Sequence, residues 1–198
     1  MVYIKKIPSK KEYGCNYHKF CHSEGVELLK FALMKEYSYT FSEEDISKGK
    51  HGKPYIKNTP FHFNISHCDG LVVCALSETE VGIDAESIRQ VTDRVMKRCY
   101  SDSEIAYVNS LKEKDIPFTR LWTLKESYVK LTGTGVATDL KAVSFDLKSA
   151  KAFLNTVSFY QLMVGQTHIV SLCEEQNAES ILFDAIDSDF DNILVVET

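Results

Sequence analysis

Two carboxylates that could share a metal ion alternate along one short segment of this 198-residue chain. Residues 81–86 have the pattern of a strand, and successive strand side chains point to opposite faces, so Asp84 and Glu86 project to the same face. Their Cα atoms would lie roughly 6.5 Å apart, two rises of a strand. Mg²⁺ commonly takes one or two carboxylates together with substrate phosphates and water. The alternative is a solvated strand end whose charges block edge pairing, and it is favoured for an isolated Asp-x-Glu pattern.

A second group lies on a helix expected over residues 121–131, where apolar residues recur at helical spacing. Glu126 and Lys130 are four residues apart and share one face, with Trp122 one turn earlier. Glu126 could act as a third metal ligand or as a base, and Lys130 as the partner of a phosphate. The alternative is an ordinary Glu–Lys pair, worth about 0.2–0.5 kcal/mol, with Trp122 as a core anchor. Lys125 is turned about 100° away from Glu126 on the helix, so it ranks below these residues.

A third group combines a basic loop with a polar strand end. Four basic side chains surround the glycines of the loop: Lys48, Lys50, His51 and Lys53. Ser66 and His67 end a predicted strand. Neighbouring strand residues face opposite ways, so this pair cannot act as nucleophile and base, and neither a G-x-S-x-G motif nor a Walker-type phosphate loop occurs. A lone histidine is usually structural, so His67 draws interest only through its neighbours.

The elements that would carry these groups alternate between helices and strands. Helices are expected over 26–37, from Ser101 to about Leu111 behind a Ser-x-x-Glu capping box, and over 121–131, ended by Gly133. Strands are expected over 61–65, 71–76, 81–86, 142–147, 157–164, 168–172 and 181–185. Since a helix followed by strands occurs twice, the pattern favours an α+β protein built from two similar halves.

Composition removes several classes of protein. No segment approaches 18 consecutive apolar residues and the start lacks the apolar core of a signal peptide, so we expect a cytoplasmic protein without a membrane span. The six cysteines are scattered without a CxxC pair, which favours reduced, buried thiols over zinc or disulfides. The net charge is −5, but residues 1–141 carry 21 basic and 19 acidic groups, whereas residues 142–198 carry 2 and 9. A small anionic ligand is therefore compatible with the first part, and the few dispersed basic residues do not suggest nucleic-acid binding.

Taken together, the motifs resemble the 4′-phosphopantetheinyl transferases of the Sfp type. The family pattern has four parts, which stand here as GKPY, FNISH, GIDAE and WTLKESYVKLTG, over about residues 49–135. The resemblance implies two similar α/β halves related by a pseudo-twofold axis, with the halves expected at residues 1–79 and 80–198. It also implies a monomer that transfers the 4′-phosphopantetheine arm of coenzyme A (CoA) to a serine of an apo acyl or peptidyl carrier protein, releasing adenosine 3′,5′-bisphosphate.

The resemblance assigns roles to residues of this chain. The ligands of Mg²⁺ would be Asp84, Glu86 and Glu126. Glu126, directly or through a water, would deprotonate the carrier serine, and Lys130 would stabilise the pyrophosphate and the departing bisphosphate. The contacts to CoA would come from Lys53, Ser66, His67 and Lys130. Family members commonly place basic residues near the N-terminus for the 3′-phosphate; here residues 17–23 offer Lys19 and His22, and no arginine precedes Arg89.

Two matters stay open at the level of sequence. The basic residues after the Asp84 strand could form a surface for an acidic carrier protein or an ordinary solvated helix face: Arg89, Arg94, Lys97 and Arg98. The chain could also be a non-catalytic CoA-binding module of the same fold, although the complete carboxylate set and Lys130 argue against that. An unrelated Mg²⁺-dependent phosphohydrolase is a third possibility, and the lack of a phosphate-loop motif counts against it.

Overall fold

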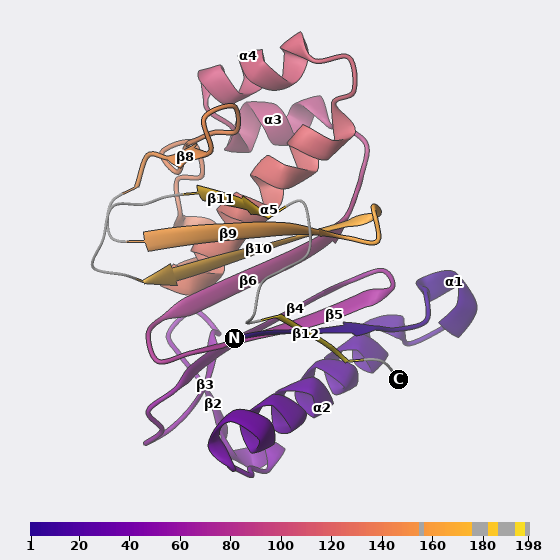
Figure 1. Ribbon diagram of the computed structural model, residues 1–198, viewed down its shortest axis with the longest axis vertical. Helices are drawn as coiled ribbons and strands as arrows, with labels where there is room; N and C mark the ends of the chain where they lie inside the picture. Colours follow the sequence, from indigo (N-terminus) through magenta and orange to yellow (C-terminus); the bar gives the residue numbers. More distant parts are fainter. Residues whose placement is uncertain (155–156, 176–181, 186–192, 197–198) are drawn as a thin grey trace.

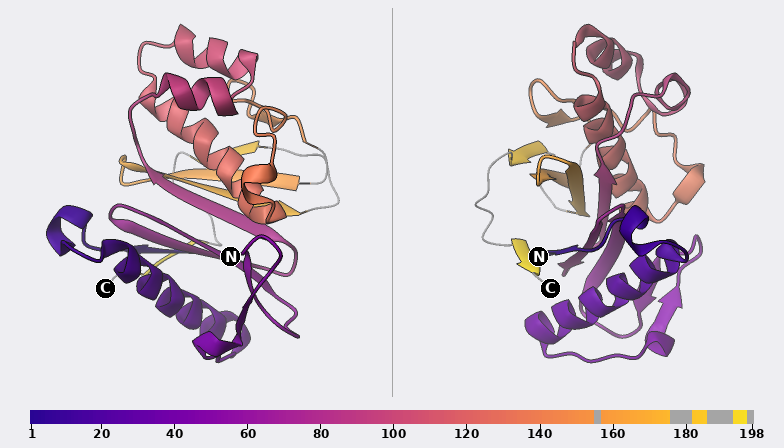
Figure 2. Two further views of the ribbon diagram at one scale, coloured as in Figure 1. Left: turned by 180° about the vertical axis from the view of Figure 1, so that it is seen from behind. Right: turned by 90° about the vertical axis from the view of Figure 1, so that its right-hand side faces the viewer.

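Two four-stranded sheets lie face to face between helices in the computed structural model, which describes residues 1–154, 157–175, 182–185 and 193–196 (Figure 1). The first sheet has the strand order β12-β1-β5-β4 and the second has the order β11-β9-β10-β6. Helix α2 covers the outer face of the first sheet, and α5 covers that of the second (Figure 2). The mixed α+β class with two α/β halves is thus confirmed.

The first half begins with β1 (Val2–Lys6) and the short α1 (Lys10–Tyr13), followed by the long α2 (Tyr17–Tyr37). A 3₁₀ turn (Glu43–Asp45) leads into a small hairpin of β2 (Ile46–Lys48) and β3 (Pro54–Ile56). Strands β4 (His62–Cys68) and β5 (Leu71–Ser77) pair antiparallel, and β5 pairs antiparallel with β1.

The second half begins with β6 (Val81–Ser87) and three helices, α3 (Asp93–Cys99), α4 (Asp102–Ser110) and α5 (Asp115–Thr132). A 3₁₀ turn (Gly135–Ala137) and a small hairpin of β7 (Phe145–Asp146) and β8 (Lys151–Ala152) follow. The antiparallel strands β9 (Val157–Val164) and β10 (His168–Glu175) come next, then β11 (Leu182–Ala185) and β12 (Ile193–Val196).

The two halves repeat one topology. In each, a strand leads to a long helix, a small hairpin and two further antiparallel strands, and the sheet order β1-β5-β4 corresponds to β6-β10-β9. The fourth strands break the correspondence, since β11 joins β9 whereas β12 returns to the first sheet and runs parallel to β1. The division of the chain between residues 79 and 80 stays a prediction, and β12 lies beyond it in sequence but in the sheet of the first half.

Alternation along the strands builds three apolar clusters. One face of the first sheet packs against α2 through residues such as Phe63 and Val72. The other face meets the second sheet through residues such as Val73 and Ile83, and the outer face of the second sheet meets α5. Each of the three apolar layers excludes water, and the burial that follows is the main favourable contribution to folding.

Several expectations about element ends hold in the structure. Ser101 and Glu104 form a reciprocal capping box at the start of α4, and Gly133 ends α5 in the left-handed conformation with φ of 62°. All six cysteines are free, and no helix within the described ranges has the length and apolarity that a membrane crossing needs. The expected strand 181–185 corresponds to β11, apart from residue 181, which lies outside the described residues.

The strand expected over residues 142–147 is wrong for most of its length, because only Phe145–Asp146 form a strand. The reason is a buried lysine. Lys125 projects from α5 and donates hydrogen bonds to the carbonyl oxygens of Leu140 and Val143, which holds this stretch as a turn. Apolar alternation alone does not reveal such a tertiary contact.

Lys125 also forms a fully buried ion pair. Its Nζ lies 2.9 Å from Glu104 Oε2, and both side chains have no exposed surface. Glu104 in turn accepts hydrogen bonds from the backbone N–H groups of Ser101 and Phe145. The ion pair therefore ties α5, α4 and β7 together, which explains why Lys125 points away from the face of α5 that carries Glu126.

Removing the charge of Lys125 should lower the stability of the folded protein. Lys125→Met leaves the Glu104 carboxylate buried without its partner, so we expect the free energy of unfolding to fall by about 3–5 kcal/mol in urea denaturation. The double variant Lys125→Met/Glu104→Gln removes both charges and should recover much of the loss. A single variant as stable as the wild type would contradict this role.

Candidate functional site

The two halves meet where β4 and β6, which belong to different sheets, pack side by side. Side chains of β4 bond the backbone of β6 there. The N–H of Ile83 donates to Asn64 Oδ1 at 2.9 Å, and the N–H of Ala85 donates to Ser66 Oγ at 3.3 Å. These two bonds take the place that a backbone ladder holds within each sheet.

The order of residues in β4 follows from this junction. Phe63, Ile65 and His67 lie on the face covered by α2, where Gly25 lets the helix approach Ile65 closely. Asn64 and Ser66 lie on the opposite face, toward β6. Because of this alternation, one face of β4 packs against α2 and the other face supplies the polar side chains that bond β6.

Strand β6 lies against α5 at a distance that only glycine permits. A Cβ atom on Gly82 would stand 2.0 Å from the carbonyl oxygen of Ser127 and 2.3 Å from the nitrogen of Leu131. Gly82, Asp84 and Glu86 share one face of β6, so the two acidic side chains point toward the helix that carries Lys130 and Glu126. The glycine therefore sets how closely the charged groups of strand and helix meet.

Asp84, Ser66 and Lys130 form the buried centre of the site. Lys130 Nζ lies 2.6 Å from Asp84 Oδ1 and donates to Ser66 Oγ at 2.7 Å, and Ser66 Oγ donates to the same Asp84 oxygen at 3.1 Å. Asp84 is 5% exposed, and its other oxygen, Oδ2, is buried without a hydrogen-bond partner. An acceptor left without a donor in such a place is a position where a cation or a donor group can bind.

Glu86 is held on the same face by two neighbours. Its Oε1 accepts a hydrogen bond from Trp122 Nε1 at 3.0 Å and lies 3.4 Å from Arg89 Nη1. The Arg89 guanidinium in turn stacks 4.6 Å from the centre of the Trp122 ring. Burial raises the pKa of the Glu86 carboxyl, while the charge of Arg89 opposes that rise and the charge of Asp84 adds to it.

Glu126 is half-buried one turn before Lys130 on α5. Burial and then the charge of Asp84 raise the pKa of its carboxyl, while Lys130 opposes the rise. Glu126 lines a cavity of about 510 Å³ together with Trp122 and with Arg94 and Arg98 of α3. A carboxylate with a raised pKa beside a cavity has the character of a general base.

Histidines from α2 gather around His67. The rings of His67 and His18 meet edge to face with centroids 5.2 Å apart. Burial lowers the pKa of His67, and the nearby charges of His18, Lys130 and His22 lower it further. His18 was not singled out by its sequence pattern, because a histidine inside a helix carries no signal of its own. The lowered pKa favours the neutral form of the His67 ring, so any contact of this ring with a phosphate would be a hydrogen bond from its N–H.

The carboxylates offer the hard oxygen ligands that Mg²⁺ prefers, but they are not gathered into a finished metal centre. Within the described ranges, no group of three His, Cys, Asp or Glu side chains is placed to hold a metal ion together. Asp84 Oδ2 is nevertheless a buried oxygen without a partner, and burial, with a contribution from the charge of Asp84, raises the pKa values of Glu86 and Glu126. One or two carboxylates suffice for Mg²⁺ when phosphates complete the coordination, so these residues fit the ion.

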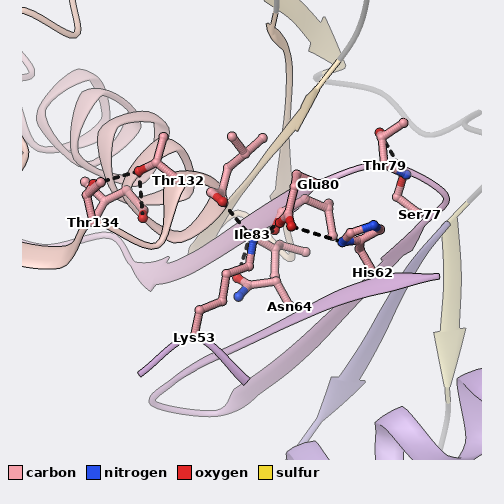
Figure 3. Close-up of polar contacts among 12 residues, drawn as sticks. Lys53, His62, Asn64, Ser77, Thr79, Glu80, Ile83, Thr132 and Thr134 are labelled. Carbon is pink, nitrogen blue, oxygen red and sulfur yellow. Dashed lines mark hydrogen bonds and ion pairs between the residues drawn. The ribbon is translucent and has the colours of Figure 1, made fainter. Parts of the chain in front are cut away.

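Lys53 and Arg89 have partners within the protein that their sequence positions did not indicate. Figure 3 shows Lys53, the residue before β3, extending toward Glu80, the residue before β6, where its Nζ lies 2.5 Å from Glu80 Oε2. Arg89 packs on Trp122 and Phe118 instead of facing solvent with Arg94 and Arg98. The structure thus brings Ser66, Asp84 and Lys130 into direct contact and places Lys53 at the neighbouring junction.

We predict that Gly82→Ala disrupts this site. The added methyl group must push α5 away from β6, so we expect the free energy of unfolding to fall by more than about 2 kcal/mol and the melting temperature to drop. Gly49→Ala is the matched control, because a Cβ there would lie 3.5 Å from its nearest neighbour, the carbonyl oxygen of Lys53. Equal melting temperatures for the two variants would contradict the close approach of β6 and α5.

Comparison with known proteins places these features in a family. The family model described as "4′-phosphopantetheinyl transferase superfamily" matches residues 80–179. The 4′-phosphopantetheinyl transferase Sfp of Bacillus subtilis (strain 168) is 32% identical over 156 residues, covering 73% of this chain and 68% of the relative. The L-aminoadipate-semialdehyde dehydrogenase-phosphopantetheinyl transferase of Candida glabrata is 35% identical over 187 residues, covering 82% of this chain and 72% of the relative.

Among solved structures, the Thermotoga maritima holo-[acyl-carrier-protein] synthase matches with a TM-score of 0.41 and 20% identity, covering 50% of this chain and 64% of that one. The relatives in sequence carry more weight, since they are more than 30% identical and this chain spans about two thirds or more of their length. On those matches, the chain belongs to the 4′-phosphopantetheinyl transferase superfamily.

Proposed function

We propose that this protein transfers the 4′-phosphopantetheine arm of CoA to a serine of an apo acyl or peptidyl carrier protein. The observation that carries the proposal is the contact of Asp84, Ser66 and Lys130 between the two halves, with Asp84 Oδ2 buried and unpartnered. A module that only binds CoA has no need for a buried aspartate beside a lysine and two further carboxylates.

The reaction assigns a task to each group. The carrier serine Oγ attacks the phosphorus that bears the pantetheine arm, and the bond from that phosphorus to adenosine 3′,5′-bisphosphate breaks. The serine proton passes to Glu126, directly or through a water; burial and the charge of Asp84 raise the pKa of this carboxyl, which favours its taking up a proton. Lys130 stabilises the negative charge of the pyrophosphate and of the departing bisphosphate.

The metal and CoA contacts follow from the same residues. Mg²⁺ would be held by Asp84, Glu86 and Glu126, where it would neutralise charge on the phosphoryl oxygens. Ser66 and His67 would contact the CoA phosphates, with His18 and His22 of α2 beside them. The Ser66 hydroxyl donates to Asp84 and accepts from Lys130, so its contact with a phosphate would require its O–H to turn from Asp84 to the phosphate.

The carrier protein would bind next to Glu126. Arg94 and Arg98 line the cavity that Glu126 also lines, so an acidic carrier would find positive charge around its reacting serine. We further expect a monomer, because one chain supplies both halves of the site. We also expect the protein to be located in the cytoplasm.

A mass measurement tests the transfer. Incubation with CoA, Mg²⁺ and apo carrier proteins of the fatty-acid, polyketide, peptide-synthetase and lysine pathways should add one phosphopantetheine arm to at least one carrier. Removal of Mg²⁺ with a chelator should stop the reaction. Binding of CoA without modification of any carrier would instead support the non-catalytic module.

Two variants test the assigned roles in the same assay. Asp84→Ala removes a metal ligand and Glu126→Gln removes the base, so we expect both to abolish transfer while circular dichroism shows a folded protein. Full activity of Asp84→Ala would refute the metal assignment, and full activity of Glu126→Gln would refute the assignment of the base.

A further inference from the structure

The ammonium group of Lys53 connects three elements at the junction of the two halves (Figure 3). Lys53 is the residue before β3. Its Nζ lies 2.5 Å from Glu80 Oε2, 2.7 Å from the carbonyl oxygen of Leu131 and 3.1 Å from that of Val81. Leu131 lies in the last turn of α5, and Val81 is the first residue of β6. One side chain from the first half thus holds the end of a helix and the start of a strand in the second.

These contacts use the full donor capacity of the side chain. A lysine ammonium has three N–H groups, and Lys53 has three acceptors within 3.1 Å. The carbonyl oxygens at the C-terminus of a helix carry partial negative charge, which a lysine there compensates. Contact with a CoA phosphate would require at least one of these bonds to break, so the geometry disfavours the role that the sequence motif suggested.

The stem of Lys53 is also fixed. A Cβ atom on Gly133, the residue that ends α5, would stand 3.5 Å from both Cβ and Cδ of Lys53. The Lys53 side chain is 18% exposed. Glu80, its anionic partner, is held from the other side by His62 Nδ1 at 3.2 Å. The ammonium is therefore held in one place by packing and by a partner that is itself positioned.

These contacts affect the position of Lys130 relative to Asp84. Leu131 directly follows Lys130, and Val81 precedes Asp84 by three residues, so Lys53 joins the two backbone segments that carry the 2.6 Å contact between Lys130 and Asp84. Fixing the ends of a helix and a strand against each other limits how far their side chains can separate.

We propose that Lys53 is a positioning residue: its ammonium group keeps Lys130 and Asp84 aligned and does not contact the phosphates of CoA. This role rests on the proposed transferase function. Lys53→Met keeps the stem and removes the ammonium. We expect it to lower kcat by about 10- to 100-fold, since small displacements of reacting groups cost rate steeply. The KM for CoA should stay within about twofold of the wild type, because no contact to CoA is lost.

Hydrogen exchange gives a readout that does not depend on activity. In Lys53→Met, the amides in the last turn of α5 should exchange faster than in the wild type, while those in the middle of α2 keep their protection. Lys57→Met is the matched control. Lys57 and Lys53 both line a cavity of about 870 Å³, and Lys57 is exposed. Its kcat, KM and exchange should equal those of the wild type.

A second variant covers the case in which Lys53→Met does not fold. Glu80→Gln weakens the same contact without altering Lys53 and should also lower kcat with little change in KM for CoA. A rise in KM for CoA at unchanged kcat would make Lys53 a CoA ligand and overturn the proposal. A lower melting temperature with wild-type kinetics would overturn it too. If the wild type proves inactive, the proposed function fails, and the exchange experiment still decides whether Lys53 holds α5.

Discussion

The arrangement of the site depends on how β6 is held against β4. An edge strand presents unpaired N–H groups, and a buried N–H without a partner costs about 1–3 kcal/mol. Here Asn64 and Ser66 of β4 satisfy the N–H groups of Ile83 and Ala85. Because these bonds come from side chains at fixed positions, they define one register, and a shift by one residue would turn Asp84 away from α5. The same Ser66 hydroxyl that holds the strand also touches Asp84 and Lys130, so structural and chemical roles coincide in one atom.

Charge is distributed so that an anionic substrate can approach an acidic protein. The chain carries a net charge of −5, yet its acidic excess lies in residues 142–198, which follow the motifs in the sequence. At the site, Lys130 and Arg89 neutralise Asp84 and Glu86, and histidines of α2 lie beside His67. On the proposed function, Mg²⁺ would add further positive charge where the pyrophosphate of CoA would bind. The net charge of the whole chain is therefore a poor guide to the ligand, whereas the balance of charged side chains around the site is a good one.

The parts of the fold that depend on local sequence pattern could be predicted from the sequence. Alternation marked β4 and β6, a continuous apolar run marked β5, the capping box marked the start of α4, and Gly133 marked the end of α5. The sequence did not show that β12 returns to β1, because parallel pairing between distant segments leaves no local signal. Long side chains were the hardest to place. Lys53, Arg89 and Lys125 all lie where tertiary packing offers acceptors or rings, and their positions in the motifs did not specify those partners.

The most direct test of this account is the hydrogen-exchange rate of the Ile83 amide. In the wild type we expect strong protection, because this N–H is buried and donates to Asn64 Oδ1. In Asn64→Leu, which keeps the branching at Cγ but removes the acceptor, we expect faster exchange at Ile83 together with loss of carrier modification. The account would be contradicted if Ile83 exchanged rapidly in the wild type. Unchanged protection and full activity in Asn64→Leu would contradict it equally.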